Sequence, residues 1–306
     1  MNTLLNQYLS QIELGEPLQF GNIVTFPVFT RGDHPLEYLT LTEALQQRLA
    51  AITEVSAAGQ VPNVKVANQS DLYLLLLEGE ELLGARQNRT LNTSILLAGK
   101  SETVVPVSCT EAGRWAYKSA LFADANCISP HTLRMIKSKS VAAALKGNQG
   151  HTSDQHAVWR EVAHLCASSH AKSPTSALHD AMLAKAAELE QCLAHLKPLP
   201  DQQGLVAVVN GQVAGLDVVS SRRAYALLHP KFVRSYAMEA VLEQKPATTE
   251  NCRDRVLSFL ESSKSSSETI HKGVGCGEDH RFQGPGIAGA ALVTEGNVIH
   301  LNLYRN

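Results

Sequence analysis

Arginine, asparagine and hydroxyl side chains alternate along one segment of the chain, residues 84–97 (GARQNRTLNTSILL). Successive side chains of an extended strand point to opposite faces, so one face of this segment would carry Arg86, Asn88, Thr90, Asn92 and Ser94. Arginine offers a charged fork of donors and asparagine offers both a donor and an acceptor, which suits recognition of a phosphate or a ribose diol. A solvated edge strand would have the same pattern, and that structural interpretation stays open.

A second segment, residues 106–111, is expected to pair with the first through a turn at residues 99–101. With that turn, the residue numbers of two paired positions add up to about 200, so Asn88 and Arg89 are expected to lie opposite Glu111. Carboxylates, amides and guanidinium groups would then converge. The predicted ligand-binding residues are Glu78, Glu81, Arg86, Asn88, Arg89, Asn92, Glu111 and Arg114.

Cys109 invites interpretation as a nucleophile, because a nearby cation lowers the pKa of a thiol and favours the reactive thiolate. The loop of rhodaneses and cysteine phosphatases has the pattern Cys-x5-Arg, whereas Arg114 lies only five positions after Cys109. A buried, inert thiol is therefore the favoured interpretation. Glu111 and Cys109 stay the weak catalytic candidates, and the sequence leaves open whether the chain is an enzyme.

The sequence predicts no metal site and names no cofactor, because HExxH, CxxC and paired-carboxylate spacings do not occur. Its six cysteines are widely spaced and are expected to be free thiols. The glycine-rich tract at residues 273–289 lacks the Walker lysine and is interpreted as a long loop, with a lid role left open. Trp115 and Trp159 are expected to anchor the core at helix starts.

The composition limits the classes of function. The chain has 306 residues, of which 44% are apolar, and its 27 basic and 29 acidic side chains nearly cancel. Such a chain can form a sizeable core but has no charge pattern for duplex DNA or anionic lipid. No apolar run approaches the roughly 20 residues of a membrane helix, and residues 1–15 do not resemble a signal peptide. We therefore expect a cytoplasmic protein with neither nucleic acid nor a membrane as partner, while a homo-oligomer stays open.

Apolar spacing predicts an α+β fold, interpreted as one large mixed domain over residues 1–306. Residues 1–112 are β-rich, residues 113–200 are helical, and residues 201–306 return to β-hairpins around a helical pair. In the first region, strands are predicted at residues 22–29, 51–55, 63–67, 72–77, 85–97 and 103–110.

Capping residues mark the expected helix starts. Residues 40–43 (TLTE) have the form of a capping box, in which the two side chains satisfy each other's backbone donors. Ser129 and Ser173 are each followed by proline, a pair typical of an N-cap and first helical residue. They predict helices that end at about residues 146 and 196, and a third helix is predicted over residues 155–167.

The sequence also contains an internal repeat. Residues 204–219 (GLVAVVNGQVAGLDVV) align without a gap to residues 289–304 (GAALVTEGNVIHLNLY), and each has the alternation and central glycine of a β-hairpin. Residues 76–86 have the same form with one extra residue after Gly79, as in a bulged hairpin. Duplication and convergence on a common hairpin pattern both stay open.

Residues 78–97 (EGEELLGARQNRTLNTSILL) and 105–115 (VPVSCTEAGRW) resemble the ARG and rhodanese-phosphatase-superfamily-associated protein domain family. In that name, ARG stands for ADP-ribosylglycohydrolase. Blocks at residues 215–217 and 273–293 extend the resemblance over nearly the whole chain. The resemblance implies a context of ADP-ribose or phosphate-ester metabolism and supplies no catalytic residue.

Two classes of function follow from these observations. The first is binding of a phosphorylated or ADP-ribosyl nucleotide-like ligand in a polar pocket formed by the GARQNR and SCTEAGRW segments. The second is a non-enzymatic scaffold or oligomerisation module without a small-molecule ligand. A deep pocket lined by the polar side chains would favour the first, and a flat self-complementary surface the second. Ligand binding is preferred, because arginine and asparagine on a central strand are costly to bury without polar partners.

Overall fold

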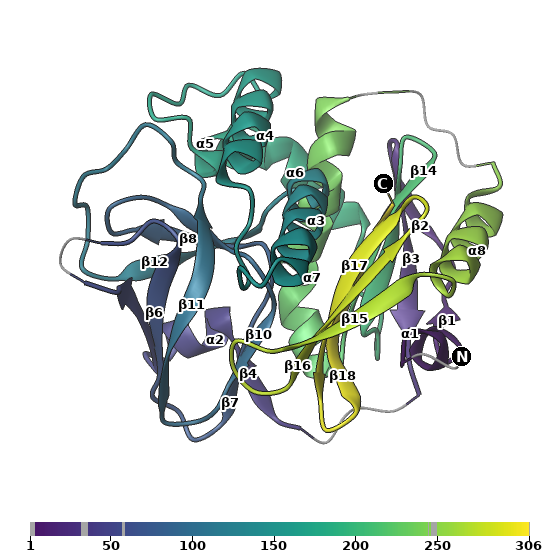
Figure 1. Cartoon of the computed structure of the whole chain (residues 1–306). Coiled ribbons are helices and arrows are strands. Elements are labelled where there is room, and N and C mark those ends of the chain that lie inside the picture. The colour runs from purple at the N-terminus through teal and green to yellow at the C-terminus, as the bar shows by residue number, and fades with distance from the viewer. Residues whose placement is uncertain (1–3, 32–35, 57–58, 244, 246–249, 306) are drawn as a thin grey trace. The chain divides into compact units, whose positions relative to one another are not determined.

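The computed structural model describes residues 4–31, 36–56, 59–243, 245 and 250–305. The fold is mixed α+β, as predicted, and the chain divides into two compact units (Figure 1). Unit 1 comprises residues 1–35, 187–272 and 277–306, and unit 2 comprises residues 36–186 and 273–276. That residues 1–306 form one domain stays a prediction.

Unit 1 is built on an antiparallel sheet that has nine strands within the described residues. The strands follow the order β1-β3-β13-β14-β18-β17-β16-β15, and β2 also pairs with β3. The strands are β1 (Glu13–Leu14), β2 (Leu18–Phe20), β3 (Ile23–Phe29), β13 (Gly204–Val209), β14 (Gln212–Val219), β15 (Ser267–Lys272), β16 (Glu278–Gly284), β17 (Ile287–Thr294) and β18 (Asn297–Arg305). The helices are α1 (Leu4–Leu9), α6 (Ala186–His195), α7 (Arg222–Leu242) and α8 (Cys252–Ser263).

The two faces of the unit 1 sheet differ in chemistry. Val218 of β14 and Leu301 of β18 belong to an apolar cluster that includes side chains of α1 and α8. Their neighbours Asp217 and His300 therefore point to the opposite face, because side chains alternate along a strand. Helix α7 lies on that face, where the Tyr236 hydroxyl donates a hydrogen bond to Asp217. A long helix with buried polar residues thus covers a polar part of the sheet.

The internal repeat is confirmed as two antiparallel hairpins of this one sheet, β13–β14 and β17–β18. The register is irregular between Ala207 and Val208 in the first hairpin and between Leu292 and Val293 in the second, which are matching positions of the repeat. The third predicted hairpin, residues 76–86, is wrong. Its two strands belong to different sheets, because the turn at Gly79 passes the chain from one sheet to the other.

The glycine-rich tract at residues 273–289 is not the predicted long loop. Most of it forms β16 and the start of β17, joined by Pro285 and Gly286. Gly286 has a φ of +71°, a left-handed conformation that suits a tight hairpin turn and that glycine adopts without strain. The strand β16 pairs with β15 and β17, so it is an interior strand. Its charged residues Asp279 and Arg281 are buried, which hides the strand from a search for apolar alternation.

Unit 2 contains a three-stranded sheet, β10-β7-β4, and a six-stranded sheet, β12-β8-β9-β11-β6-β5, counted over the described residues. Both surround an apolar cluster that includes Ile52, Leu74, Leu82 and Val105. The strands are β4 (Tyr38–Thr40), β5 (Ala50–Glu54), β6 (Asn63–Asn68), β7 (Tyr73–Leu76), β8 (Glu80–Gly84), β9 (Arg89–Leu91), β10 (Ile95–Leu97), β11 (Ser101–Cys109) and β12 (Phe122–Ile128).

Four helices complete the described part of unit 2: α2 (Leu41–Gln46), α3 (His131–Lys146), α4 (Gln155–Ser168) and α5 (Leu178–Ala184). The capping box at Thr40 and Glu43 is confirmed. The helix expected after Ser173 begins later, at Leu178, because Ser176 has a φ of +49° and interrupts the first turn. The region predicted as one helix is divided into two helices, α5 and α6, which are separated at Lys185.

The continuous strand predicted over residues 85–97 is wrong. Gly84 has a φ of +120° and Ala85 a φ of +41°, so the chain leaves the sheet after β8 and returns at Arg89. The pairing of β9 with β11 is antiparallel as predicted, but it places Arg89 opposite Cys109, two positions from the predicted register. The reason is that β10 pairs with β7 instead of β11, so the turn at residues 99–101 does not set this register.

Candidate functional site

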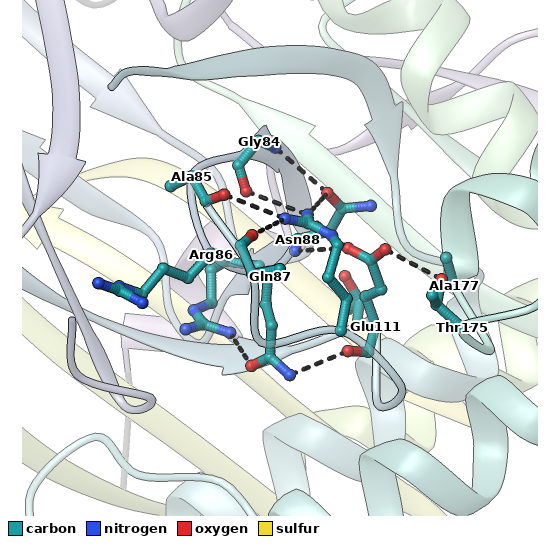
Figure 2. Close-up of polar contacts among 12 residues, drawn as sticks. Gly84, Ala85, Arg86, Gln87, Asn88, Glu111, Thr175 and Ala177 are labelled. Atoms are coloured by element: carbon teal, nitrogen blue, oxygen red, sulfur yellow. Dashed lines mark hydrogen bonds and ion pairs between the residues drawn. The ribbon is translucent and has the colours of Figure 1, made fainter. Parts of the chain in front are cut away.

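The loop from Gly84 to Asn88 is held in place by one guanidinium group. Arg114 Nη1 donates to the carbonyl oxygens of Ala85 and Ala116, each at 3.0 Å. Its Nη2 donates to Gly84 O and Asn88 Oδ1, each at 3.2 Å. Figure 2 shows the Gly84 and Ala85 carbonyls and the Asn88 amide turned toward this centre. Arg114 is therefore engaged by the protein itself.

Glu111 completes this cluster. One carboxylate oxygen lies 2.6 Å from Arg114 Nη2 and accepts the Asn88 backbone N–H at 3.1 Å, and the other accepts the Thr175 hydroxyl at 3.0 Å (Figure 2). Burial alone would raise the pKa of Glu111, but these three hydrogen bonds and the Arg114 charge outweigh it, so the pKa lies below its usual value. Glu111 is thus an ionised group with satisfied oxygens, which makes it a weak proton acceptor at neutral pH.

Cys109, the other catalytic candidate, lies at the end of β11 and is fully buried. The Gln155 side-chain amide clamps its backbone: Oε1 accepts the Cys109 N–H at 2.8 Å, and Nε2 donates to the Cys109 carbonyl at 2.9 Å. The thiol lies 3.4 Å from the Glu111 carbonyl oxygen. Burial of this thiol agrees with the sequence-based interpretation.

Arg86, Arg89 and Trp115 form a second arrangement beside the first. The guanidinium carbons of Arg86 and Arg89 lie 5.9 and 5.5 Å from the centre of the Trp115 ring. Such distances allow cation–π attraction. Trp115 is 46% exposed and lies in an irregular segment, so its prediction as a core anchor at a helix start is wrong. The indole does not enter the core because its ring rests on the two guanidinium groups.

The two arginines differ in burial. Arg89 is fully buried, and its Nη1 donates to Gln87 Oε1 at 2.7 Å, while Gln87 Nε2 donates to the Glu111 carbonyl at 3.1 Å. Within the described residues, Nε and Nη2 of Arg89 make no hydrogen bond. Burial lowers the pKa of this guanidinium, and the neighbouring Cys109 and Glu54 partly offset that effect. The side chain of Arg86 is partly exposed and extends away from the Glu111 cluster in Figure 2.

Glu81 of β8 lies in a separate environment. It is fully buried, and its carboxylate accepts hydrogen bonds from the Thr110 hydroxyl at 2.9 Å and the Cys127 thiol at 3.4 Å. His179 Nδ1 lies 3.9 Å away, and the His179 side chain is 27% exposed. Burial raises the pKa of Glu81 to about 7, and the charges of Glu111 and Asp180 add to this effect. A carboxyl group with a neutral pKa next to a histidine is typical of a proton-exchanging site.

The remaining predicted ligand residues lie outside both arrangements. The Glu78 backbone N–H donates to Ser94 Oγ at 3.0 Å, and the Glu78 carboxylate lies 3.9 Å from Arg134 Nε of α3. Asn92 accepts the Ser108 hydroxyl at 2.7 Å and donates to the His151 carbonyl at 3.1 Å. The structure therefore brings Asn88, Arg89, Glu111 and Arg114 together, adds Arg86 at their edge, and places Glu78, Glu81 and Asn92 in other contacts.

The sequence-based list of ligand-binding residues omits Trp115 and His179, which lie near these groups. Trp115 is part of the SCTEAGRW segment, but its exposure depends on the tertiary position of Arg89. His179 stands far from Glu81 in the sequence, and only the fold brings them together. The described residues contain no group of three histidine, cysteine or acidic side chains placed to hold a metal ion.

A cavity of about 710 Å³ in unit 2 is lined by Thr42, Leu45, Arg48, Leu121, Asp124 and neighbouring residues. None of the predicted site residues lines it.

The fold and this cluster define an α+β protein. Its second unit has a buried polar network around Glu111 and Arg114, next to the exposed Trp115 and the partly exposed Arg86. The chain belongs to the ARG and Rhodanese-Phosphatase-superfamily-associated Protein domain family, ARPP-1, whose model matches residues 11–304. The resemblance noted from residues 78–97 and 105–115 is thereby confirmed. No curated protein and no solved structure matches the chain. Across the described residues, helices that combine the length and apolar character needed to cross a membrane do not occur.

Proposed function

We propose that unit 2 binds a phosphorylated or ADP-ribosyl nucleotide-like ligand at the Trp115 surface, by which we mean Arg86, Trp115, Tyr117 and Lys118, with the buried Arg89 guanidinium near the Trp115 ring. In this proposal the indole ring stacks with the planar base of the ligand, and the partly exposed Arg86 and exposed Lys118 bind its phosphates, while the charge of buried Arg89 adds to the attraction. The family name supports the choice of ligand class, because it associates the domain with ARG proteins and the rhodanese-phosphatase superfamily.

The observation that carries this proposal is an exposed Trp115 ring flanked by two arginines. Tyr117, two residues further along, is 70% exposed, and Lys118 is exposed as well. Aromatic side chains interleaved with cations are the usual means by which proteins hold nucleotides without regular base pairing. Buried Arg89 adds donors that no described residue uses.

Asn88, Glu111 and Arg114 have a different role in this proposal. Their polar atoms bind one another and the backbone of the loop, which fixes the position of Arg86 and Arg89. Such support is needed because a binding group must be held in place before the ligand arrives. These three residues are therefore positioning residues, and the ligand contacts fall to Arg86, Lys118 and the aromatic rings.

The alternative is an oligomerisation module that uses the same exposed side chains. Trp115, Tyr117 and Leu121 are 46%, 70% and 53% exposed, and a second copy of the chain would cover such apolar surface favourably. Light scattering coupled to size exclusion separates the two functions. A dimer that becomes a monomer in Trp115→Ala, with no effect of any nucleotide, would support the module.

Fluorescence quenching tests ligand binding directly, because the chain has two tryptophans, Trp115 and Trp159. The variant Trp159→Phe leaves Trp115 as the sole reporter. We expect ADP-ribose to quench this reporter in a saturable way, with inorganic phosphate binding more weakly because it offers no ring to stack. The Arg86→Ala variant should bind about tenfold more weakly, the cost of one charge-assisted hydrogen bond.

Arg160→Ala is the matched control, since Arg160 is an exposed arginine of α4 outside the Trp115 surface. Thermal shift gives an independent readout: a ligand at 100 times its Kd stabilises the folded protein by about 2.7 kcal/mol. Absence of saturable quenching with ADP-ribose and its phosphorylated forms, in a folded Trp159→Phe protein, would overturn the proposal.

A further inference from the structure

The cavity of about 710 Å³ in unit 2 lies where the six-stranded sheet ends. Strands β5 and β12 are the outermost strands of that sheet, yet they contact each other, and residues of both line the cavity. The sheet therefore curves until its two edges lie close together. Helix α2 contacts both edge strands and forms the third side of the cavity. The residues of the Trp115 surface do not line it.

The larger part of the cavity wall is apolar. Phe122 belongs to the apolar core of unit 2, Leu45 packs against that core, and Leu121 is 53% exposed. Three further positions of the wall carry only a methyl group, which leaves room between the edge strands: Ala50, Ala51 and Ala123. A cavity of this volume, with apolar walls and a few polar groups, is typical of a site for a small molecule.

Arg48 gives this wall a positive charge. Its side chain is exposed, and within the described part of the chain it makes no hydrogen bond or ion pair. A planar guanidinium that the protein does not engage can bind a carboxylate through two parallel hydrogen bonds.

The carboxylate of Asp124 lies on the same wall and is held by the protein. It accepts the Thr42 hydroxyl at 2.6 Å and the Asn126 backbone N–H at 2.8 Å. Its negative charge repels an anion, and it repels a doubly charged phosphate ester more than a singly charged carboxylate. The charges of the wall therefore favour a monocarboxylate.

The backbone at Arg48 makes arginine an unfavourable residue for stability at this position. Arg48 follows the last turn of α2 with a φ of +58°, its N–H donates to Leu45 O at 3.1 Å, and the Leu49 N–H donates to Ala44 O at 2.7 Å. In this Schellman arrangement the left-handed residue is usually glycine or asparagine. Helix α3 ends in the same arrangement with Asn148, whose φ is +56°. An arginine that strains the backbone without binding a described residue is expected to act on another molecule.

We propose that this cavity binds a small apolar monocarboxylate. The carboxylate of the ligand binds Arg48, and its apolar body lies against Leu45, Leu121 and Phe122. All of these residues belong to unit 2, so the site is complete within that unit. It is separate from the Trp115 surface and does not depend on the function proposed there.

Calorimetric titration of the whole protein tests this proposal with acetate, hexanoate and phenylpropionate as probes. We expect affinity to rise in that order, because the larger probes bury more apolar surface. Phenylpropanol, which has the same ring without the charge, should bind about tenfold more weakly than phenylpropionate. Phenyl phosphate should also bind more weakly. Failure of both hexanoate and phenylpropionate to bind the folded protein, or equal binding of phenylpropanol, would overturn the proposal.

Variants then separate binding from stability. Arg48→Gly removes the guanidinium and relieves the left-handed backbone, so it should keep or raise Tm while weakening phenylpropionate binding about tenfold. Asn148→Gly is the matched control, because it makes the same backbone change at the end of α3 and should leave binding unchanged. Ala123→Leu should abolish binding by filling the cavity, and Ala123 is exposed, so the larger side chain does not disturb the core.

Wild-type affinity in Arg48→Gly would refute the assignment, and a lower Tm in that variant would make Arg48 a structural residue and count against it equally. Arg86→Ala should leave phenylpropionate binding unchanged, which distinguishes failure of this site from failure of the Trp115 surface. Light scattering tests whether a second copy of the chain covers the exposed Leu121 instead. A dimer whose formation excludes phenylpropionate would overturn the proposal.

Discussion

Glu81 should make the stability of the protein fall between pH 5 and pH 8. Its pKa is about 7 in the folded protein, against 4.5 for an ordinary glutamate in the unfolded chain, because burial penalises the charged carboxylate. A group whose pKa is raised by folding stabilises the folded state fully below its unfolded value, and this contribution is lost as the pH rises through the folded value. A difference of about 2.5 pKa units corresponds to about 3 kcal/mol, most of it lost between pH 5 and pH 8.

The variant Glu81→Gln removes the titrating group but keeps an oxygen that accepts the Thr110 hydroxyl. We expect its free energy of unfolding in urea to fall by about 2 to 3 kcal/mol less than that of the wild type between pH 5 and pH 8. Titrating groups that do not interact with Glu81 contribute equally to both proteins and cancel in this comparison. Glu111 and Asp180 interact with Glu81 through their charges, and His179, whose pKa is lowered by burial, adjoins it.

Repeating the pair of measurements in a His179→Asn background removes the histidine titration. Parallel pH profiles of the wild type and Glu81→Gln in that background would refute the role assigned to Glu81. Glu111→Gln supplies a control of opposite sign, because folding lowers the pKa of Glu111. Its contribution is present above the unfolded pKa and is lost as the pH falls through the folded value, so Glu111→Gln should flatten the acid side of the profile.

Three further predictions concern Arg114, Gln155 and the cysteines. Arg114→Ala should destabilise the protein by about 3 kcal/mol in urea unfolding, because it leaves the buried Glu111 carboxylate without its cation; a loss below about 1 kcal/mol would contradict the assigned role. Gln155→Ala should cost about 1 to 2 kcal/mol through the two lost hydrogen bonds to Cys109, and Gln155→Glu should be the worse substitution because it cannot donate. In the native protein, a thiol reagent should modify the partly exposed Cys276 first, and rapid modification of fully buried Cys109 would contradict its interpretation as inert.

Local signals predicted the elements well where the chemistry that forms an element is close in sequence. The capping box at Thr40 and Glu43 lies within one helical turn, and each hairpin of the repeat is closed by its own glycine turn. Such features depend on neighbouring residues alone. They are therefore readable before the fold is known.

The predictions of strands and of strand register are wrong where a contact with a distant residue overrides the local pattern. Residues 85–97 alternate as a strand should, yet Arg114 binds the carbonyl oxygens of Gly84 and Ala85 and holds the chain out of the sheet. The register of β9 on β11 differs by two positions because β10 pairs with β7. In the glycine-rich tract, buried Asp279 and Arg281 disguise an interior strand. Each of these outcomes depends on a contact between segments that the local sequence does not reveal.

Polar residue types alone also do not separate a binding group from a structural one. Arg89 and Arg114 are both arginines beside the same loop, and the sequence treats them alike. Arg114 directs both of its terminal nitrogens to protein acceptors, whereas Nε and Nη2 of buried Arg89 make no hydrogen bond among the described residues. A buried guanidinium with unused donors is costly, so a ligand that supplies acceptors would recover that free energy, while none remains to be recovered at Arg114. This difference directs the search for a ligand to the surroundings of Arg89, and it makes loss of stability the expected effect of changing Arg114.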